Sequence, residues 1–292
     1  MKSTRGDLVF NIINYSLVSL FFLVVLYPIY FILIASISNP DYVNIGAITF
    51  WPRGITIEGY LRTFREGNVW RGYRNTILYT TVGTSINVFL TMTAAYALSR
   101  KELIGRALIM RIIVFTMLFS GGLIPTYLIV KGLGMTNTIW AMVIPNAVSA
   151  WNLIIARTYL QTSVSQELLE AALVDGCSYS RFFWSIVVPL SGAIIAVLAL
   201  LYSVAHWNSF FTGLIYLQDY SKYPLQLILR DILLGFQTTG SADDAKTIQE
   251  MQRIADLMKY ALIFVASFPV MVLYPFLQRY FVKGVMVGAI KG

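Results

Sequence analysis

Residues 165–190 read SQELLEAALVDGCSYSRFFWSIVVPL, a polar stretch between two long apolar runs. Its first half has the marks of a short helix, because Ser163 is followed three residues later by Gln166, as in a capping box. Gly176 lies where a helix C-terminus often needs a left-handed residue, and Ser178 can cap the helix that follows. The stretch therefore predicts a helix–turn–helix elbow.

The second helix of the elbow leads into an apolar run, so we expect a push on the elbow to move a membrane helix as one rigid piece. Pro189 and Gly192 should kink or loosen the first turns of that helix. The elbow also carries the acidic residues Glu167, Glu170 and Asp175. An anionic membrane surface would repel these carboxylates. They favour a basic protein partner over a purely interfacial anchor, which remains the alternative.

The composition indicates a membrane protein. The 292 residues are 57% hydrophobic and only 12% charged, whereas a soluble domain has about 25% charged residues. The 22 Lys and Arg residues are spread along the loops between apolar segments, which argues against nucleic-acid binding. With one cysteine and one histidine, neither a disulfide framework nor a cysteine- or histidine-rich metal site is expected.

Six apolar runs are long enough to cross a bilayer, which takes about 20 residues. Inside a membrane the backbone must satisfy its own hydrogen bonds, so continuous runs of this length predict helices rather than a β-barrel. The predicted fold is an all-α membrane protein with six transmembrane helices. The expected spans are 10–37, 76–98, 108–130, 138–160, 182–204 and 257–281.

The spans divide the chain into residues 1–75, an N-terminal span with the first outer loop, and residues 76–292, a five-helix core. This core contains the elbow loop, 161–190, and a long outer loop, 206–256. Cations divide evenly between the two sides, but the dense short loop SRKELIGR favours a cytoplasmic N-terminus. The segment 241–260 predicts an amphipathic helix that either shields the bundle or docks a partner. Its apolar face would hold Ile248, Met251, Ile254 and Leu257 or Met258.

The elbow contains a recognisable spacing. Glu170-Ala171-Ala172, three residues, Gly176, nine residues, Ile186, one residue and Val188-Pro189 resembles the EAA motif of ABC-importer permeases, written EAA-x3-G-x9-I-x-L-P. Val188 replaces the usual leucine. The longer text LLEAALVDGCSYSRFFWSIVVP is similar to the carbohydrate branch of this family, with Cys177 where alanine is common.

Further stretches extend the resemblance over nearly the whole chain. They are FWPRGITIEGY (50–60), HWNSFFTGLIYLQDYSKYPLQLIL (206–229) and QRYFVKGVMVGAIKG (278–292), which resemble the first outer loop, the W-N-x-F segment and the C-terminus of sugar permeases. The stretch 121–160 resembles the subgroup that imports oligosaccharides or polysaccharide fragments, including alginate- and aldouronate-type systems.

The resemblance implies a type I ABC importer permease in a bacterial cytoplasmic (inner) membrane, with both termini cytoplasmic. Its partners would be a homologous second permease, two ATPase subunits, an extracytoplasmic solute-binding protein, membrane lipid and a carbohydrate substrate. No enzymatic activity or cofactor is expected on this chain, because ATP and Mg would bind the ATPase and no G-x-x-x-x-G-K-[ST] loop is present. The residues expected to couple to the ATPase are Glu167, Glu170, Ala171, Ala172, Asp175, Gly176, Ile186 and Pro189.

Polar and aromatic residues at membrane depth are candidates for the substrate pathway, because lipid disfavours polar groups. Each of them could equally be a helix-packing contact. His206 is expected to form a hydrogen bond or sit at the interface rather than relay protons. The candidates are Asn87, Asn146, Ser149, Trp151, Asn152, Tyr202, Trp207 and Asn208.

Three other classes are less well supported by the sequence. A secondary transporter would usually need more spans and an ionisable pair at mid-membrane, yet none of the six expected spans contains an acidic residue. A membrane enzyme would need a catalytic constellation, and a lone histidine, a lone cysteine and the lack of carboxylates in the expected spans do not provide one. An amino-acid or peptide ABC permease shares the elbow and is the nearest alternative.

Overall fold

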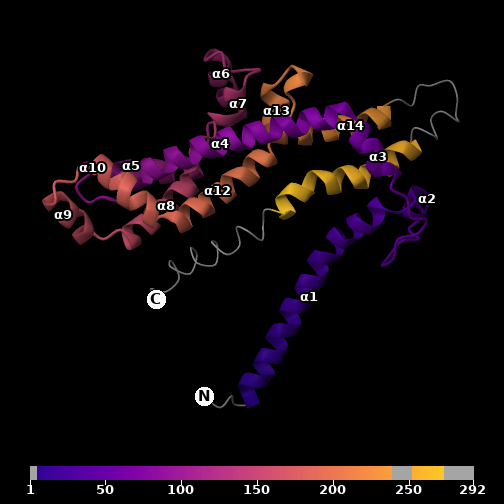
Figure 1. The fold of residues 1–292 in the computed structure, drawn as a ribbon, viewed down its shortest axis with the longest axis horizontal. Helices are drawn as coiled ribbons and strands as arrows, with labels where there is room; N and C mark the ends of the chain where they lie inside the picture. The colour runs from indigo at the N-terminus through magenta and orange to yellow at the C-terminus, as the bar shows by residue number, and fades with distance from the viewer. Residues whose placement is uncertain (1–4, 239–251, 273–292) are drawn as a thin grey trace. The chain divides into compact units, whose positions relative to one another are not determined.

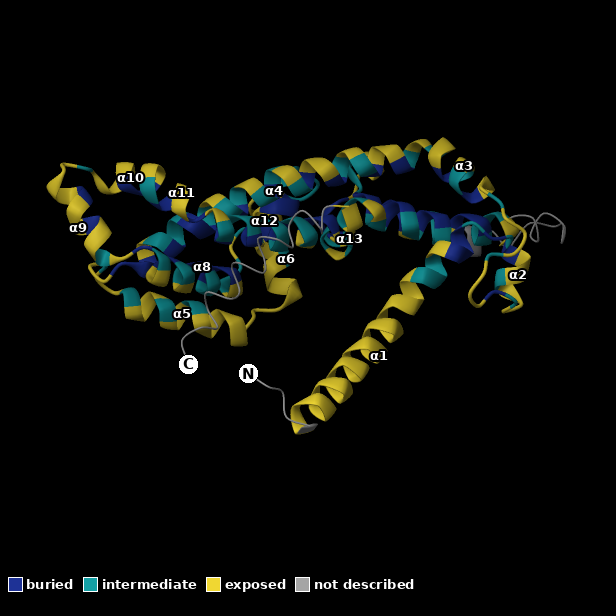
Figure 2. Ribbon diagram, turned by 60° about the horizontal axis from the view of Figure 1, so that its bottom comes forward, coloured by how far each residue is buried: buried dark blue, intermediate teal, exposed yellow. Residues whose placement is uncertain are grey.

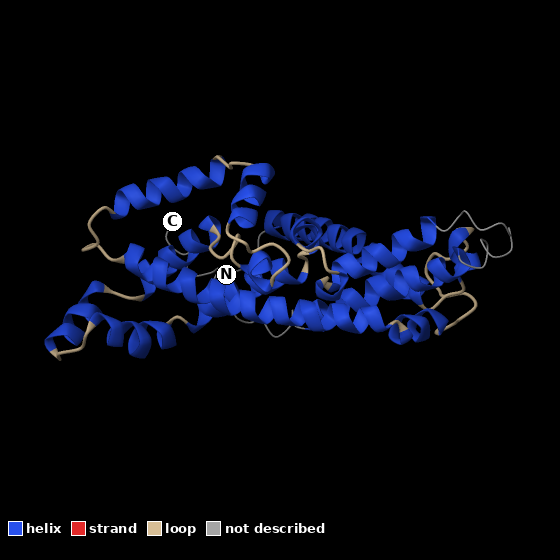
Figure 3. Cartoon of the chain, turned by 90° about the horizontal axis from the view of Figure 1, so that it is seen from above, coloured by secondary structure: helices blue, strands red, loops and turns tan. Residues whose placement is uncertain are grey.

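The computed structural model describes residues 5–238 and 252–272, and all regular structure in these residues is helical (Figure 3). This confirms the predicted all-α class. Figure 1 labels most of these elements. The α-helices before the elbow are α1 (Arg5–Ser36), α2 (Pro40–Asn44), α3 (Glu58–Arg65), α4 (Gly67–Ser99), α5 (Arg106–Leu118), α6 (Leu123–Gly132), α7 (Ile139–Val143) and α8 (Ala150–Ser163).

The elbow and the elements after it complete the described chain. They are α9 (Gln166–Val174), α10 (Tyr179–Phe182), the π-helix η1 (Phe183–Val187), α11 (Val188–Leu190), α12 (Gly192–Trp207), α13 (Phe210–Tyr216), the 3₁₀-helix η2 (Tyr220–Lys222) and α14 (Leu225–Thr238). A last helix covers Gln252–Val272, and we call it the C-terminal helix. The described residues form two compact units, one of residues 5–69, 229–238 and 252–268 and one of residues 70–228 and 269–272.

In the first unit, α1 is apolar on all sides. Only 6% of its most apolar window is buried, and Figure 2 shows most of its length as exposed. A helix that is apolar all round is stable in lipid or against another protein rather than in water. The C-terminal part of α1 is tied to its unit through Phe31, whose ring meets Tyr260 edge to face at 6.1 Å.

The second unit has the larger core. Apolar side chains from α4, α8, α9, α10, η1 and α12 form one buried cluster, in which Phe182, Leu160, Leu169 and Leu198 are almost fully buried. The elbow helix α9 is therefore packed on the same core as the long helices, and its position is fixed by burial of apolar surface.

The expected spans 108–130, 138–160 and 182–204 are not continuous helices, which corrects the first two predictions, whereas the third span was expected to kink. The first is α5 and α6, bent by 115°, and the third is α10–α11 and α12, bent by 79°. The second consists of α7 and α8, separated at residues 144–149. Among the described residues three helices are long and apolar enough to cross a membrane, or up to five if each bent pair is one span. The count of six remains a prediction.

Each break has a local cause in the sequence. Gly122 has φ +85° between α5 and α6, a conformation that disfavours side chains. Pro145 lies between α7 and α8, and Ser149 caps α8 by accepting from the N–H of Asn152. Pro189 removes a backbone donor just before the bend at Ser191. Apolar composition alone hides these breaks, because it measures length and hydrophobicity but not backbone continuity.

The expected outer loop, 206–256, is mostly helical where it is described. It contains α13, η2 and α14. The separate amphipathic helix expected over 241–260 is also corrected, because its described part belongs to the C-terminal helix. Leu257 and Met258 are buried there and Ile254 is half-buried, whereas Ile248 and Met251 lie outside the described residues.

Gly59 gives a test of the packing in the first unit. A Cβ at Gly59 would lie 2.3 Å from the carbonyl oxygen of Leu257, so Gly59→Ala must shift backbone at a cost of about 1–3 kcal/mol. We expect a lower apparent melting temperature in detergent, by roughly 2–4 °C per kcal/mol. The matched control is Gly67→Ala, where no atom lies within 4 Å of the added Cβ. Equal melting temperatures for the two variants would contradict this packing.

Candidate functional site

The elbow turn is set by Gly176. The C-terminus of α9 closes with two hydrogen bonds, from the N–H of Cys177 to the carbonyl of Ala172 at 2.9 Å and from the N–H of Gly176 to the carbonyl of Leu173 at 3.0 Å. This pair of bonds is a Schellman motif, which needs a left-handed residue after the cap. Gly176 has φ +76°, as the sequence predicts.

The N-terminal caps of the elbow are serines. Ser165 accepts the N–H of Leu168 at 3.3 Å, and Ser178 accepts the N–H of Arg181 at 3.3 Å. The prediction for Ser178 is confirmed, whereas Ser163 does not cap α9. Ser163 is the last residue of α8, so the capping hydroxyl comes from Ser165, one residue before the first helical residue, Gln166.

The second arm of the elbow is not one rigid rod. After α10 the backbone widens into the π-helix η1, and the arm bends by 79° relative to α12. Ser191, at the bend, is fully buried, and its hydroxyl has no hydrogen-bond partner among the described residues. The expected kink is confirmed, but rigid continuity between the elbow and its membrane helix is wrong, because Pro189 and the π-helix interrupt the regular bonding pattern.

The structure separates the predicted coupling residues into an exposed and a packed group. Ala172 is only 8% exposed and lies in the core, and Ile186 is half-buried against the same core. Val174 is 87% exposed at the tip of α9 and was not among the predicted residues, although an apolar residue beside the turn is a usable signal. The exposed residues are Glu167, Glu170, Ala171, Asp175, Gly176 and Pro189.

The entry of the elbow contacts the loop after α4. Gln166 donates to the Glu102 carboxylate from its side-chain amide. A hydrogen bond from the backbone N–H of Glu102 and the bond from Gln166 hold the pKa of the Glu102 carboxyl below its ordinary value. The elbow surface is thus acidic, with Glu102 beside α9 and with Glu167 and Glu170 along it. An exposed acidic helix with an apolar tip suits a basic, partly apolar partner surface.

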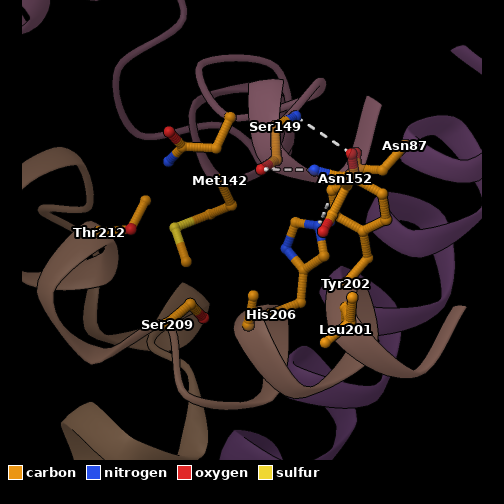
Figure 4. Close-up of a pocket in the computed structure, with 11 residues that line it drawn as sticks. Asn87, Met142, Ser149, Asn152, Leu201, Tyr202, His206, Ser209 and Thr212 are labelled. Carbon is orange, nitrogen blue, oxygen red and sulfur yellow. Dashed lines mark hydrogen bonds between the residues drawn. The ribbon is translucent and has the colours of Figure 1, made fainter. Parts of the chain in front are cut away.

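A polar cavity of about 200 Å³ lies between α4, α12 and the segments around α7, α8 and α13 (Figure 4). Neighbouring turns of α4 and α12 supply two facing pairs. The Asn87 amide lies 3.1 Å from His206 Nε2, and the Thr91 and Tyr202 hydroxyls are 2.7 Å apart. The lining residues are Asn87, Met142, Asn146, Ser149, Asn152, Leu201, Tyr202, Ala205, His206, Ser209 and Thr212.

The two helices approach closely because one residue has no side chain. A Cβ at Gly83 would lie 2.3 Å from the His206 ring, so glycine makes room for the imidazole. Tyr202 also accepts the N–H of Ser149 at 3.0 Å, which fixes the start of α8 to the α4–α12 pair. These bonds hold the wall of the cavity in one arrangement.

Two polar atoms of the cavity lining lack a partner. The Asn87 side-chain oxygen and the Ser209 hydroxyl are buried and have no hydrogen-bond partner among the described residues. A buried unpaired polar atom costs about 1–3 kcal/mol, which a ligand or water would offset. The described lining holds amides, hydroxyls and one imidazole but no Asp, Glu, Lys or Arg. Such a lining can exchange hydrogen bonds with hydroxyl groups but offers no ion pair.

The cavity brings together most of the predicted pathway residues. Asn87, Asn146, Ser149, Asn152 and Tyr202 line it, and so does His206, whose expected hydrogen bond is present.

Three predicted pathway residues lie elsewhere. Trp151 is 61% exposed, Trp207 is buried with its ring 6.1 Å from Tyr73, and Asn208 donates to the Val204 carbonyl of its own helix at 2.9 Å.

Sequence reasoning missed five lining residues. Met142, Leu201 and Ala205 carry no polar signal, so only packing reveals them. Ser209 could have been predicted from the sequence, because it follows His206 by three residues and would share its helix face if the helix continued. Thr212 lies one further turn along, on α13.

Comparisons with known proteins agree with this architecture. The chain is 36% identical over 292 residues to Protein LplC of Bacillus subtilis, covering 100% of this chain and 98% of LplC. It is 36% identical over 286 residues to the polygalacturonan/rhamnogalacturonan transport system permease protein YtcP of the same organism, covering 97% and 98% of the two chains.

A solved structure has a similar fold. It is a bacterial ABC transporter involved in the import of the acidic polysaccharide alginate, with a TM-score of 0.84, 31% identity, and coverage of 96% of this chain and 99% of that chain. The C-terminal stretch 278–292, which contributed to the expected resemblance, lies outside the described residues.

Residues 87–287 match the model of the binding-protein-dependent transport system inner membrane component. This match takes in the elbow and every residue that lines the cavity, and the full-length relatives agree with it. The chain therefore belongs to the family of binding-protein-dependent transport system inner membrane components, and it is a permease subunit of the ABC-transporter type rather than an enzyme.

Proposed function

We propose that this chain is one of two transmembrane subunits of an ATP-driven importer that moves oligosaccharides or polysaccharide fragments across a bacterial cytoplasmic membrane. The observation that carries the proposal is the elbow. Its helix α9 is anchored in the core through Leu169 and Ala172, while Glu167 and Glu170 are exposed. A helix with one face packed in the core and acidic residues on its exposed face suits a docking contact that must bear force.

The partner at the elbow is an ATPase. The sequence contains no phosphate-binding G-x-x-x-x-G-K-[ST] loop, so nucleotide energy comes from another chain, which holds the ATP and Mg. In the proposed contact Glu170 pairs with a basic residue of the ATPase, Ala171 allows close approach, and Gly176 sets the turn. The assembly contains two ATPase copies, a homologous second permease and an extracytoplasmic binding protein, with both termini of this chain on the cytoplasmic side.

The cavity is the proposed contribution of this chain to the substrate pathway. Its amides and hydroxyls, among them the exposed Asn146 amide, are suited to sugar hydroxyls. The named functions of the relatives, transport of polygalacturonan or rhamnogalacturonan and import of alginate, support a saccharide substrate.

An amino-acid importer and a secondary transporter are less well supported. A free amino acid carries two charges that need partners when buried, and the described cavity lining contains no charged side chain. A secondary transporter needs an ionisable pair for coupling at membrane depth. The relatives reported above are named for saccharide transport where a substrate is named.

Reversing the charge of the elbow tests the ATPase contact. Glu170→Lys should lower the amount of ATPase that co-purifies with this chain about tenfold or more, because an attractive charge pair becomes repulsive. The control is Glu58→Lys, which reverses an exposed acid whose described ion pair is with Arg62, 2.7 Å away on α3. Unchanged assembly and transport in Glu170→Lys would show that the elbow is not the docking site.

Substrate class is tested in proteoliposomes that contain the complex and its binding protein. Neutral or uronate oligosaccharides should raise the rate of ATP hydrolysis, because a loaded binding protein triggers the cycle. Amino acids should leave the rate at its basal value. Stimulation by an amino acid, with no response to any oligosaccharide, would overturn the saccharide assignment while leaving the permease family intact.

The cavity is tested by two matched substitutions. Asn146 lines it and is exposed, whereas Asn208 lies outside it. Asn146→Leu removes hydrogen-bonding capacity worth about 0.5–1.5 kcal/mol, so the half-saturating substrate concentration for transport should rise between about twofold and tenfold. Asn208→Leu should leave that concentration unchanged. Equal effects of the two substitutions would argue against a role for this cavity.

A further inference from the structure

Of the two covalent routes from the elbow to the cavity, α8 leads without a break from Ser163 to Asn152 and its cap Ser149, whereas the route through α10 is interrupted. Movement of α10 would have to pass through the π-helix η1 and the 79° bend at Ser191 before it reached α12. Tyr202 and His206, which line the cavity, lie beyond that bend. A π-helix followed by a sharp bend acts as a hinge, so it would take up part of a displacement of α10 before that displacement reached α12.

Helix α4 offers an uninterrupted route. It runs from Gly67 to Ser99 without a break, and its last turn is tied to the entry of the elbow. The Arg100 guanidinium, just after α4, donates to the carbonyl of Val164 at 3.3 Å. In return Arg157, on α8, donates from Nε to the carbonyl of Leu98 at 3.0 Å. The ends of α4 and α8 therefore hold each other through two arginine–carbonyl bonds.

These arginines bond to backbone carbonyls, although the Glu102 carboxylate is close enough to Arg100 to interact with it electrostatically. Neither Arg100 nor Arg157 forms an ion pair with a carboxylate among the described residues, and Arg100 is only 8% exposed. A buried cation must be hydrogen-bonded to be tolerated. Its bonds to backbone carbonyls are charge-assisted and so stronger than bonds between neutral groups. These two bonds hold α8 and the entry of the elbow to the end of α4.

The exit of the elbow contacts the same turn of α4. The Tyr96 ring lies 5.1 Å from the Phe183 ring and 6.4 Å from the Phe182 ring. The Arg100 guanidinium lies over the Tyr96 ring, 5.0 Å from its centroid, at a distance that allows a cation–π interaction. Arg100 and Tyr96 thus join the two ends of the elbow to each other and to α4.

The other end of this route is the cavity wall. Thr91 and Asn87 lie five and nine residues before Tyr96 on the same helix, and they form the bonds to Tyr202 and His206. At 1.5 Å per residue the distance along α4 from Tyr96 to Asn87 is about 14 Å. A displacement of the last turn of α4 would shift these two bonds without passing the hinge at Ser191.

We propose that α4 transmits motion of the elbow to the cavity, and that Arg100 and Tyr96 are positioning residues that couple the elbow to this helix. We call α4 the relay helix. This inference rests on the proposed docking of an ATPase at the elbow. It differs from that proposal because it concerns how motion leaves the elbow rather than what binds there.

The experiment measures the cavity directly. Cys177 is the only cysteine, so Cys177→Ala gives a background in which Ala205→Cys, an exposed residue of the cavity lining, is the single thiol. The complex in proteoliposomes is treated with a small membrane-impermeant maleimide, with and without a non-hydrolysable ATP analogue. The ratio of the two labelling rates reports how far nucleotide binding changes access to the cavity.

We expect a ratio of about fivefold or more in this background, the lower end of ordinary coupling between two sites. Arg100→Gln and Tyr96→Leu should bring the ratio close to one while the ATPase still co-purifies. Arg100→Lys should recover part of it, because lysine keeps a charged donor. The matched control is Arg111→Gln, since Arg111 is exposed and donates to the Ala107 carbonyl of its own helix α5; it should keep the full ratio.

Other results would overturn the relay. A full ratio in both Arg100→Gln and Tyr96→Leu would show that motion reaches the cavity by another route. Loss of ATPase co-purification in these variants would show that they shape the docking surface instead. If the Cys177→Ala, Ala205→Cys background itself binds no ATPase and its labelling rate does not change with nucleotide, the proposed function is wrong, and the result does not bear on the relay helix alone. Testing two variants on different contacts keeps the inference decidable if one of them does not fold.

Discussion

Every helix end at membrane depth leaves backbone groups that lipid cannot satisfy, and in this chain side chains of one unbroken helix, α4, and of the residue after it provide partners at several such ends. Near the start of α4, Thr76 accepts the N–H of Leu225 at 2.8 Å, and Tyr79 donates to the carbonyl of Lys222 at 2.7 Å. At its end, Arg100 donates to the carbonyl of Val164. Helix α8 can end and α14 can begin at these points because α4 and Arg100 supply hydrogen-bond partners for their backbone groups.

This constraint explains why polar residues occur at membrane depth in α4. Asn75, Thr76 and Tyr79 serve one set of chain ends, and Asn87 and Thr91 serve the pairing with α12. Of these residues only Asn87 lines the cavity. A polar residue in a transmembrane segment is therefore an ambiguous functional signal, since structural hydrogen bonding and substrate contact require the same residue types.

The elbow could be predicted from sequence because its signals are local. Gly176 and Ser178 act within four residues of themselves, so their spacing is enough to place the turn and the second cap. The predicted N-cap of α9, Ser163, lies two residues before the actual N-cap, Ser165. The two serines are equally good candidates until the end of α8 is known. The breaks at Gly122 and Pro145 were missed because these residues were read within runs whose hydropathy alone supports a span, whereas the kink at Pro189 was predicted.

The cavity could be predicted only in part, because facing direction depends on packing. Asn87, Asn146, Asn152 and Tyr202 were found by residue type. Trp151 and Trp207 are the same kind of candidate by type, yet Trp151 is exposed and Trp207 packs on Tyr73. Which side of a helix faces the cavity is fixed by tertiary contacts such as the Gly83–His206 approach, and a single sequence does not record these contacts.

The cavity also bears on how an acidic saccharide would be handled. Relatives of this chain transport polygalacturonan or rhamnogalacturonan, or take part in alginate import, and a uronate carboxylate is poorly tolerated in an apolar site without a cation. The described cavity lining has hydroxyls, amides and an imidazole but no Lys or Arg. Such a wall is suited to the hydroxyl face of a sugar ring. If the substrate is acidic, its charge must then be met outside this lining, so the importer would divide recognition between two surfaces, one for hydroxyls and one for charge.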